Sequence, residues 1–176
     1  CSGVNTLYRC ESREAETWMD LLAYNRPAVL KLVSPSKMLS FAVLLGVDGQ
    51  QAILVYDQRI TRMSLEQLGQ LWSGQFVFIW QPPPAYTQQF ALGDRSPVVH
   101  WMAARFAELD GQQKLLSGEK FNAALAERVK IFQRQNDLAD DGVVGLMTLL
   151  KLNEQLDNEP TLVNYAERQQ SAPDEG

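Results

Sequence analysis

The sequence contains only one histidine, His100, and two cysteines, Cys1 and Cys10. Zinc sites in proteins are built mainly from several histidine and cysteine ligands, and this chain has too few of them to assemble such a site. A Ser-His-Asp or Cys-His catalytic arrangement would have to use His100, which we interpret as an ordinary helix histidine. A phosphate-binding glycine pattern is also missing. We therefore expect no metal and no cofactor.

Long apolar runs are lacking as well. No stretch approaches the ~20 apolar residues that a membrane span requires, and no basic-then-apolar leader opens the chain. We therefore expect a soluble fragment, cut from something longer. The formal net charge is −5, and residues 1–94 and 95–155 both lack a basic surplus, so nucleic-acid binding is excluded. The acidity lies in the end of the chain, where residues 156–176 hold one arginine and five acidic residues.

The two cysteines allow two interpretations. A Cys1–Cys10 disulfide would close a short loop, would stabilise the fold by roughly 2.5 kcal/mol in the chain-entropy model, and would indicate an oxidising compartment. Two free thiols are the alternative, and the sequence leaves both open.

The first half of the chain predicts an α+β domain over residues 1–81. An amphipathic pattern predicts a helix over residues 12–24, ended by Pro27. Asp48-Gly49 is a strong hairpin signal, and the Ser64-x-x-Gln67 capping pattern predicts a second helix over residues 64–72. Apolar or alternating runs of strand length occupy residues 27–33, 40–47, 51–56, 59–64 and 75–80. This is a helix plus a mostly antiparallel sheet.

The second half changes to helical periodicity. Three consecutive prolines, Pro82–Pro84, indicate a stiff extended segment, so we interpret residues 82–94 as a linker. A second domain is then predicted over residues 95–156, with a short irregular stretch after its first helix. Its helices are expected near residues 97–109, from the N-cap Asn122 to about Gln135, and over residues 146–156. Residues 157–176 are predicted to be an acidic, disordered tail.

Residues 131–152, IFQRQNDLADDGVVGLMTLLKL, resemble the C-terminal half of the three-helix peptidoglycan-binding domain. That family carries a Phe-Gln pair late in a helix, a Leu-containing turn, Asp-Gly-(Ile/Val)-Val-Gly and a threonine opening the last helix. The chain departs from it at Asp137, where glycine is usual, and at Leu146, where proline is frequent. The matching residues are Phe132, Gln133, Leu138, Asp141, Gly142, Val144, Gly145 and Thr148.

Most of this pattern has a structural explanation. Phe132 and Val144 would fill a small core, and Gly142 and Gly145 would supply positive φ angles around a tight turn. The resemblance implies that backbone N–H groups at the start of the third helix receive a carboxylate of a wall peptide. The residues expected to line that groove are Gln133, Arg134, Asp141, Met147 and Thr148. A solvated helix cation is the alternative interpretation of Arg134.

The first domain resembles the β-rich half of the bacteriocin-processing, papain-like cysteine peptidases. The similarity rests on the strand, hairpin and strand pattern SFAVLLGVDGQQAILVYDQ. Aligned by Gly46 and Asp57, the catalytic histidine position falls on Ser40, and the family's Asp-Pro becomes Asp57-Gln58. Cys10 precedes a predicted helix, as the catalytic cysteine would. Without a histidine partner, we expect a degenerate domain with no peptidase activity.

A degenerate peptidase-like domain followed by a peptidoglycan-binding domain resembles the periplasmic region of the general secretion pathway protein A family. That resemblance implies non-catalytic binding of peptidoglycan in the periplasm, in support of the type II secretion secretin as it assembles in or passes through the wall. It also implies an inner-membrane anchor, homo-oligomers of the full-length protein, and contacts with an inner-membrane partner and with the outer-membrane secretin.

Two other functions stay open at this level. The chain could be part of a wall hydrolase or peptidase with a wall-targeting module, although such an enzyme needs a complete catalytic constellation. It could also be a pure protein-interaction module whose second domain has lost affinity for the wall.

Overall fold

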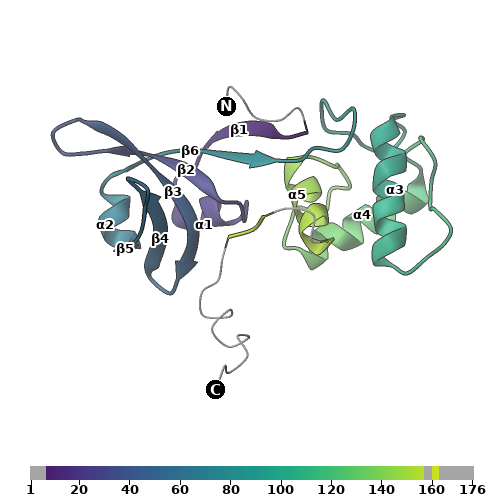
Figure 1. Ribbon diagram of the computed structural model, residues 1–176. Helices are drawn as coiled ribbons and strands as arrows, with labels where there is room; N and C mark the ends of the chain where they lie inside the picture. Colours follow the sequence, from purple (N-terminus) through teal and green to yellow (C-terminus); the bar gives the residue numbers. More distant parts are fainter. Residues whose placement is uncertain (1–6, 157–159, 163–176) are drawn as a thin grey trace, which may run out of the picture. The chain divides into compact units, whose positions relative to one another are not determined.

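The computed structural model describes residues 7–156 and 160–162. The chain divides into two compact units, Cys1–Trp80 with Pro160–Gly176, and Gln81–Glu159. The first unit is a sheet with two short helices, and the second is built on three helices (Figure 1). Within the described residues, no helix is long and apolar enough to cross a membrane.

The sheet of the first unit has six strands in the order β1-β6-β2-β3-β4-β5, and all neighbours are antiparallel. This confirms the α+β class predicted from the sequence. The elements are β1 (Arg9–Glu14), α1 (Trp18–Leu22), β2 (Ala28–Val33), β3 (Leu39–Asp48), β4 (Gln51–Tyr56), β5 (Arg59–Ser64), α2 (Leu65–Gly69) and β6 (Trp72–Trp80).

One face of the sheet forms the core of the first unit. Side chains of a strand point alternately to the two faces, and in β2, β3 and the second half of β6 every second residue is buried. Strand β2 follows this rule, with a buried side chain at each of Ala28, Leu30 and Leu32. Each short helix also buries one leucine. The other large buried apolar side chains of this unit are Leu21, Leu44, Ile53, Leu54, Leu68, Phe76, Phe78 and Trp80, and the polar Arg26 is buried as well.

Two tight hairpins join β3, β4 and β5. Asp48 pairs with Gln51, so Gly49 and Gln50 form the first loop, and Gly49 has a φ of 56°. The predicted hairpin is therefore confirmed, with its turn centred one residue later. The second loop places Asp57 and Gln58 at positive φ, 47° and 60°. Two consecutive positive φ angles are typical of a primed hairpin turn, which fits the twist of antiparallel strands.

The predicted helix over residues 12–24 is wrong in its first half. Residues 9–14 form β1, which pairs along its whole length with β6, from Arg9 opposite Trp80 to Glu14 opposite Gln75. A helix that began at residue 12 would lose this ladder. The helix that does form is short and starts at Trp18, after the N-cap Thr17, whose Oγ1 accepts the Asp20 N–H at 3.2 Å.

The second predicted helix is also too long. Its start is correct, because Ser64 Oγ accepts the N–H of Gln67 at 3.1 Å, but α2 ends at Gly69. Trp72 instead opens β6 opposite Leu32 of β2. Strand β6 thus begins three residues before the predicted strand, since its first residues gain backbone partners in the sheet.

The second unit contains α3 (Pro97–Leu109), α4 (Ala123–Gln135) and α5 (Leu146–Gln155), close to the three predicted helices. Asn122 caps α4 as expected, and its Oδ1 accepts the N–H of Leu125 at 2.9 Å. The core joins the helices through aromatic side chains. The rings of Phe106 on α3 and Phe132 on α4 meet edge to face, with centroids 5.4 Å apart.

Residues 82–94, predicted to be a linker, are part of the second unit. Tyr86 and Phe90 are buried, and the rings of Phe90 and Phe121 meet edge to face at 5.8 Å. The backbone of Phe90 also forms an antiparallel bridge with Val144, with N···O distances of 3.2 and 2.8 Å. The segment turns at Pro84 and Ala85, where the N–H of Tyr86 donates to the carbonyl oxygen of Pro83 at 3.1 Å, and its two aromatic side chains fix it within the second unit.

Most of the predicted acidic tail, residues 157–176, lies outside the described residues. Residues 160–162 are described and belong to the first unit. There the N–H of Leu162 donates to Asn25 Oδ1 at 3.2 Å, so this short piece contacts the first unit and the disorder prediction does not apply to it.

Candidate functional site

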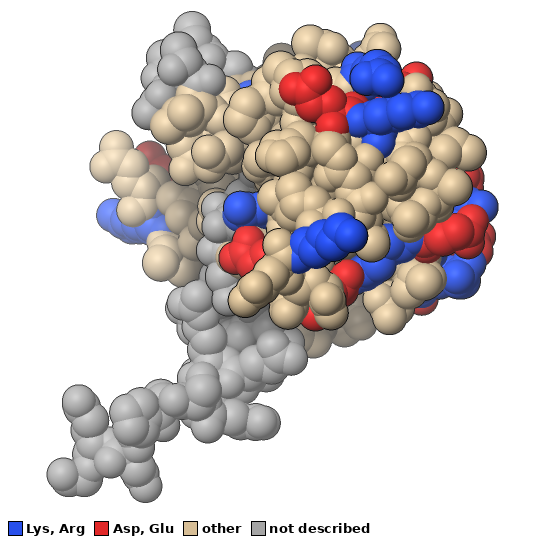
Figure 2. Space-filling model, turned by 90° about the vertical axis from the view of Figure 1, so that its right-hand side faces the viewer, with Lys and Arg blue, Asp and Glu red and all other residues tan. Residues whose placement is uncertain are grey.

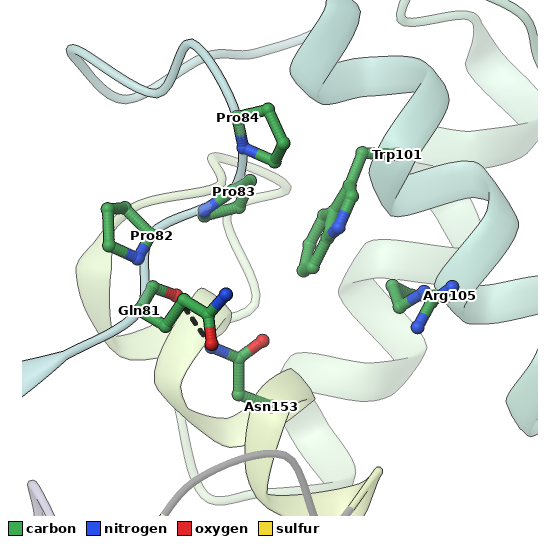
Figure 3. A pocket seen from close by; sticks show the side chains of 7 residues that line it. All are labelled: Gln81, Pro82, Pro83, Pro84, Trp101, Arg105 and Asn153. Carbon is green, nitrogen blue, oxygen red and sulfur yellow. Dashed lines mark hydrogen bonds between the residues drawn. The ribbon is translucent and has the colours of Figure 1, made fainter. Parts of the chain in front are cut away.

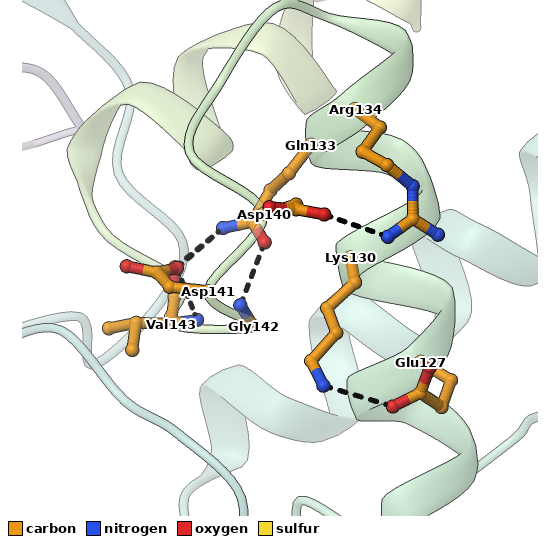
Figure 4. Close-up of polar contacts among 8 residues, drawn as sticks. All are labelled: Glu127, Lys130, Gln133, Arg134, Asp140, Asp141, Gly142 and Val143. Atoms are coloured by element: carbon orange, nitrogen blue, oxygen red, sulfur yellow. Dashed lines mark hydrogen bonds and ion pairs between the residues drawn. The ribbon is translucent and has the colours of Figure 1, made fainter.

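The loop between α4 and α5 is organised by one side chain, Gln133 (Figure 4). Its Nε2 donates to the carbonyl oxygen of Val143 at 2.9 Å and to Asp141 Oδ1 at 3.2 Å. Its Oε1 accepts the N–H of Gly142 at 2.9 Å. A side chain that bonds both a backbone donor and a backbone acceptor of one turn holds that turn in a single conformation.

Two of the residues predicted to line the groove are buried. Gln133 is 2% exposed and Thr148 is 4% exposed, and Gln133 Nε2 also lies 3.4 Å from Thr148 Oγ1. Their burial leaves almost no surface for a ligand to contact. Their position indicates that they hold the loop in place and act on any ligand only through it.

The fold-signature residues behave as expected with one exception. Phe132 and Val144 are fully buried. Gly142 has a φ of 74°, and a Cβ there would lie 3.1 Å from Lys130 Cε. Gly145 was expected to have a positive φ as well, but its φ is −107° and it forms the N-cap of α5. The prediction for Gly145 is wrong because the turn needs only one left-handed residue, which Gly142 provides.

Asp137, where the family usually has glycine, has a left-handed backbone with a φ of 55°. It follows the last turn of α4, and the N–H of Leu138 donates to the carbonyl of Gln133 at 2.9 Å. This is a Schellman-type helix end, in which glycine is common because it adopts positive φ without strain. Aspartate tolerates the same conformation better than most residues, so the turn is kept.

Three predicted residues lie at the surface of this loop. Arg134 and Asp140 form an ion pair at 2.8 Å in which both side chains are about half exposed. The hydrogen bond from Arg134 lowers the pKa of the Asp140 carboxyl. Because the pair is exposed, it adds little to stability. Asp141 is exposed and Met147 is half-buried, so both have surface that a ligand can reach.

A cavity of about 210 Å³ opens beside the Asp141–Gly142 turn. Its charged lining residues are Glu127, Lys130 and Asp141, and the ammonium of Lys130 lies 3.1 Å from Glu127 Oε1. The rest of the lining is small or apolar. We call this cavity the Asp141 groove, and its full lining is Ala91, Leu92, Ala123, Ala126, Glu127, Lys130, Asp141 and Gly142.

The Asp141 groove carries both signs of charge next to small apolar side chains. Such a lining suits a small ligand that has both a carboxylate and an amino group. The first turn of α5 adds donors nearby in sequence, because its N-cap Gly145 provides no side-chain cap. Figure 2 shows blue and red side chains in small mixed groups on a mostly tan face. Sequence reasoning missed Glu127 and Lys130, although Lys130 directly precedes the motif and Glu127 lies one helical turn before it.

The first unit does not assemble the catalytic groups of a cysteine peptidase from the positions that the resemblance assigned. Cys10 precedes α1 in the chain, as predicted, but it lies on β1 opposite Ile79 and not at the helix N-terminus, since α1 begins at Trp18. Ser40 lies on β3 opposite Leu32. Gln58 has a φ of 60°, which proline cannot adopt, so the family's Asp-Pro would not fit this turn.

Other ligand-forming groups are few. His100 is an exposed residue of α3 in the second unit. Among the described residues, no group of three or more His, Cys, Asp or Glu side chains could hold a metal ion. Cys1 lies outside the described residues, so the Cys1–Cys10 disulfide stays a prediction.

Comparison with known families agrees with the architecture of the first unit. Residues 1–82 match the family model for the GspA, peptidase C39-like domain. The first unit is therefore similar to GspA-type peptidase C39-like domains. This agrees with the peptidase-like domain of the general secretion pathway protein A type that the sequence predicted, while its lack of catalytic activity stays a prediction.

Two relatives extend the likeness beyond this GspA-type domain. General secretion pathway protein A of Aeromonas hydrophila is 25% identical over 145 residues, which cover 82% of this chain and 26% of that protein. The chain thus spans about a quarter of that relative. A periplasmic domain of the EpsAB fusion protein of the Vibrio vulnificus type II secretion system is 24% identical, with a TM-score of 0.59. That match covers 96% of this chain and 72% of the other, and it establishes a shared fold.

Proposed function

We propose that this chain is a non-catalytic, peptidoglycan-binding region of a type II secretion protein, and that it acts in the periplasm. The proposal is supported by the GspA-type domain and by a relationship to general secretion pathway protein A that covers 82% of the chain. The Asp141 groove is the wall-binding site. The observation that carries this assignment is the buried Gln133, which fixes the Asp141–Gly142 turn at the edge of the groove.

The chemistry of the wall fits this groove. Peptidoglycan stem peptides carry carboxylates and amino groups beside small methyl side chains. Lys130 would pair with a stem carboxylate, while Glu127 and Asp141 would accept hydrogen bonds from an amino group. The small residues Ala123 and Ala126 leave room for methyl groups. A volume of about 210 Å³ fits part of one stem and leaves the glycan strand outside.

The first unit has no catalytic function in this proposal. Cysteine peptidases need a thiolate next to a histidine base, and the only histidine of the chain, His100, belongs to the second unit. The first unit serves as a scaffold that contacts other proteins of the envelope. By analogy with the relatives named for type II secretion, these partners would be an inner-membrane protein and the outer-membrane secretin. The full-length protein would be anchored in the inner membrane and would form homo-oligomers.

Co-sedimentation with purified, insoluble sacculi tests the proposal. The whole chain is expected to pellet with sacculi, and Lys130→Glu is expected to weaken binding about tenfold, because it removes one charge partner and introduces repulsion. Lys114→Glu makes the same charge change at an exposed loop position outside the groove, so it is the matched control. A version ending at Gln81 should stay in the supernatant.

The result also separates the alternatives. If the whole chain does not pellet, or if both lysine variants bind as well as the wild type, the Asp141 groove is not a wall-binding site. A protein-interaction module would then be favoured by the outer face of the sheet, where large apolar side chains are solvent-exposed. The most exposed of these are Leu39, Phe41 and Ile60, each at least 60% exposed.

A further inference from the structure

A second cavity of the second unit is separate from the Asp141 groove and has a different lining (Figure 3). It has a volume of about 260 Å³. One side is the proline segment and another is α3, which contributes an indole and a guanidinium. We call it the Trp101 pocket, and it is lined by Gln81, Pro82, Pro83, Pro84, Trp101, Arg105 and Asn153.

The walls of the Trp101 pocket are held in place by the fold. Asn153 on α5 is 3% exposed, and its Nδ2 donates to the carbonyl oxygen of Gln81 at 3.1 Å. Three prolines follow directly, and their fixed φ angles keep this wall stiff. Trp101 and Arg105 lie one turn apart on α3, so they line the same side of the pocket. A site built from rigid walls loses little conformational entropy when a ligand binds.

Arg105 has unused hydrogen-bonding capacity in this wall. Its Nη1 lies 3.2 Å from Glu108 Oε2, and its Cζ lies 5.9 Å from the Trp101 ring centroid. Its Nε is buried and has no acceptor among the described residues. The side chain as a whole is 33% exposed, so a ligand that brings an acceptor oxygen can pair with the accessible N–H groups of the guanidinium.

We propose that the Trp101 pocket binds the terminal carboxylate of a peptidoglycan stem peptide. Arg105 donates hydrogen bonds to the carboxylate, since a guanidinium matches that group in shape and charge. Trp101 and the prolines contact the methyl group of the terminal alanine. The small volume favours such an end over the bulky C-terminal side chains of many proteins. The choice of the wall as the source of the carboxylate rests on the function proposed above.

The indole signal of Trp101 makes a direct reporter. The other three tryptophans, Trp18, Trp72 and Trp80, belong to the first unit. In a 1H–15N spectrum of the whole chain, Trp101→Phe removes one indole signal and thereby assigns it. The probe is a soluble disaccharide-tetrapeptide with a free terminal carboxylate. Titration is expected to shift the Trp101 indole, and the same muropeptide amidated at that carboxylate should bind at least tenfold more weakly.

Variants of Arg105 test the partner of the carboxylate. Arg105→Gln is expected to weaken binding of the free-acid muropeptide at least tenfold. The affinity of Arg105→Lys should lie between those of Arg105→Gln and the wild type, because lysine keeps the charge but lacks the planar guanidinium. Lys114→Gln loses the same charge outside the pocket and should bind like the wild type. Unchanged backbone signals of Gly142 in each variant would show that the second unit is still folded.

The outcomes separate this inference from the proposed function. If backbone signals of the Asp141 groove shift while the Trp101 indole does not, the pocket assignment is overturned and wall binding stands. Equal affinity for the acid and the amide overturns the carboxylate contact. The last titration uses a sugar-free peptide of four L-residues that ends in alanine. If it shifts Trp101 as strongly as the muropeptide, the ligand is a protein C-terminus and the stem assignment is overturned. If the muropeptide shifts no signal of the protein and the whole chain does not sediment with sacculi, the proposed function itself is refuted.

Discussion

Replacing Gln133 with alanine would test whether the loop between α4 and α5 depends on one side chain. The substitution removes the four hydrogen bonds of the Gln133 amide. It leaves the N–H of Gly142 without its acceptor in a buried position and the carbonyl of Val143 without its donor in a half-buried one. The contacts with Asp141 and Thr148 are longer, so they matter less.

The expected cost follows from these two backbone groups. A buried polar group that loses its partner costs about 1–3 kcal/mol, and we assign about 2 to the Gly142 N–H and about 1 to the more accessible Val143 carbonyl. Truncating a buried side chain removes packing as well, and we add about 1 kcal/mol for it. The total of about 4 kcal/mol is a large part of the 5–15 kcal/mol that stabilises a typical domain.

Hydrogen exchange of the Gly142 amide in the whole chain measures this effect locally. A loss of about 4 kcal/mol corresponds to roughly thousandfold faster exchange through opening of the loop. The control is Gln135→Ala, which makes the same change at an exposed position two residues later on α4. Equal exchange rates in the two variants would refute the reasoning, because the loop would then be held by something other than Gln133.

Three further predictions concern stability, each measured by urea denaturation. Asp137→Gly should raise the free energy of unfolding by about 0.5–1 kcal/mol by relieving the left-handed backbone, and a loss would contradict this. Asp110 lies 2.7 Å from Arg128, whose hydrogen bond lowers the pKa of the Asp110 carboxyl. The pair should therefore contribute about 1 kcal/mol to the free energy of unfolding at neutral pH. The difference in this free energy between the wild type and Asp110→Asn should disappear as the pH falls below about 3.9. A difference that persists at about pH 2 would contradict the prediction. Gly74→Ala should destabilise the first unit by about 2 kcal/mol, since its Cβ would meet a backbone carbonyl oxygen at 2.9 Å. Gly49→Ala, with open space around it, should cost less than Gly74→Ala.

The helices of the second unit were predicted well from the sequence, because their periodicity and the N-cap at Asn122 depend only on residues that are close in sequence. The first unit was harder for a physical reason. Strand β1 has the sequence RCESRE, which carries no apolar run, and it forms only because β6 offers backbone partners from a distant part of the chain. Trp72 was placed in a helix for the same reason, since its pairing with Leu32 cannot be seen locally.

The candidate site was predictable as a motif but not as a surface. The motif placed Phe132 and Val144 in the core correctly, yet it could not show that Gln133 is buried and bonds the loop. The Trp101 pocket was missed because the proline segment was interpreted as a linker. An extended proline run next to a helix gives no local sign of whether it leaves the domain or packs against it, and the buried Phe90 settles that question in the structure.

The pairing of Arg9 with Trp80 has a mechanical consequence. The chain enters β1 and leaves β6 at the same end of two adjoining antiparallel strands. Tension between the segment before β1 and the second unit would therefore act across the hydrogen bonds at that end and open them one pair at a time. Force along the strands would have to break the whole ladder at once. Under such tension β1 would peel away first, at low force, and would leave the edge of β6 open to another strand.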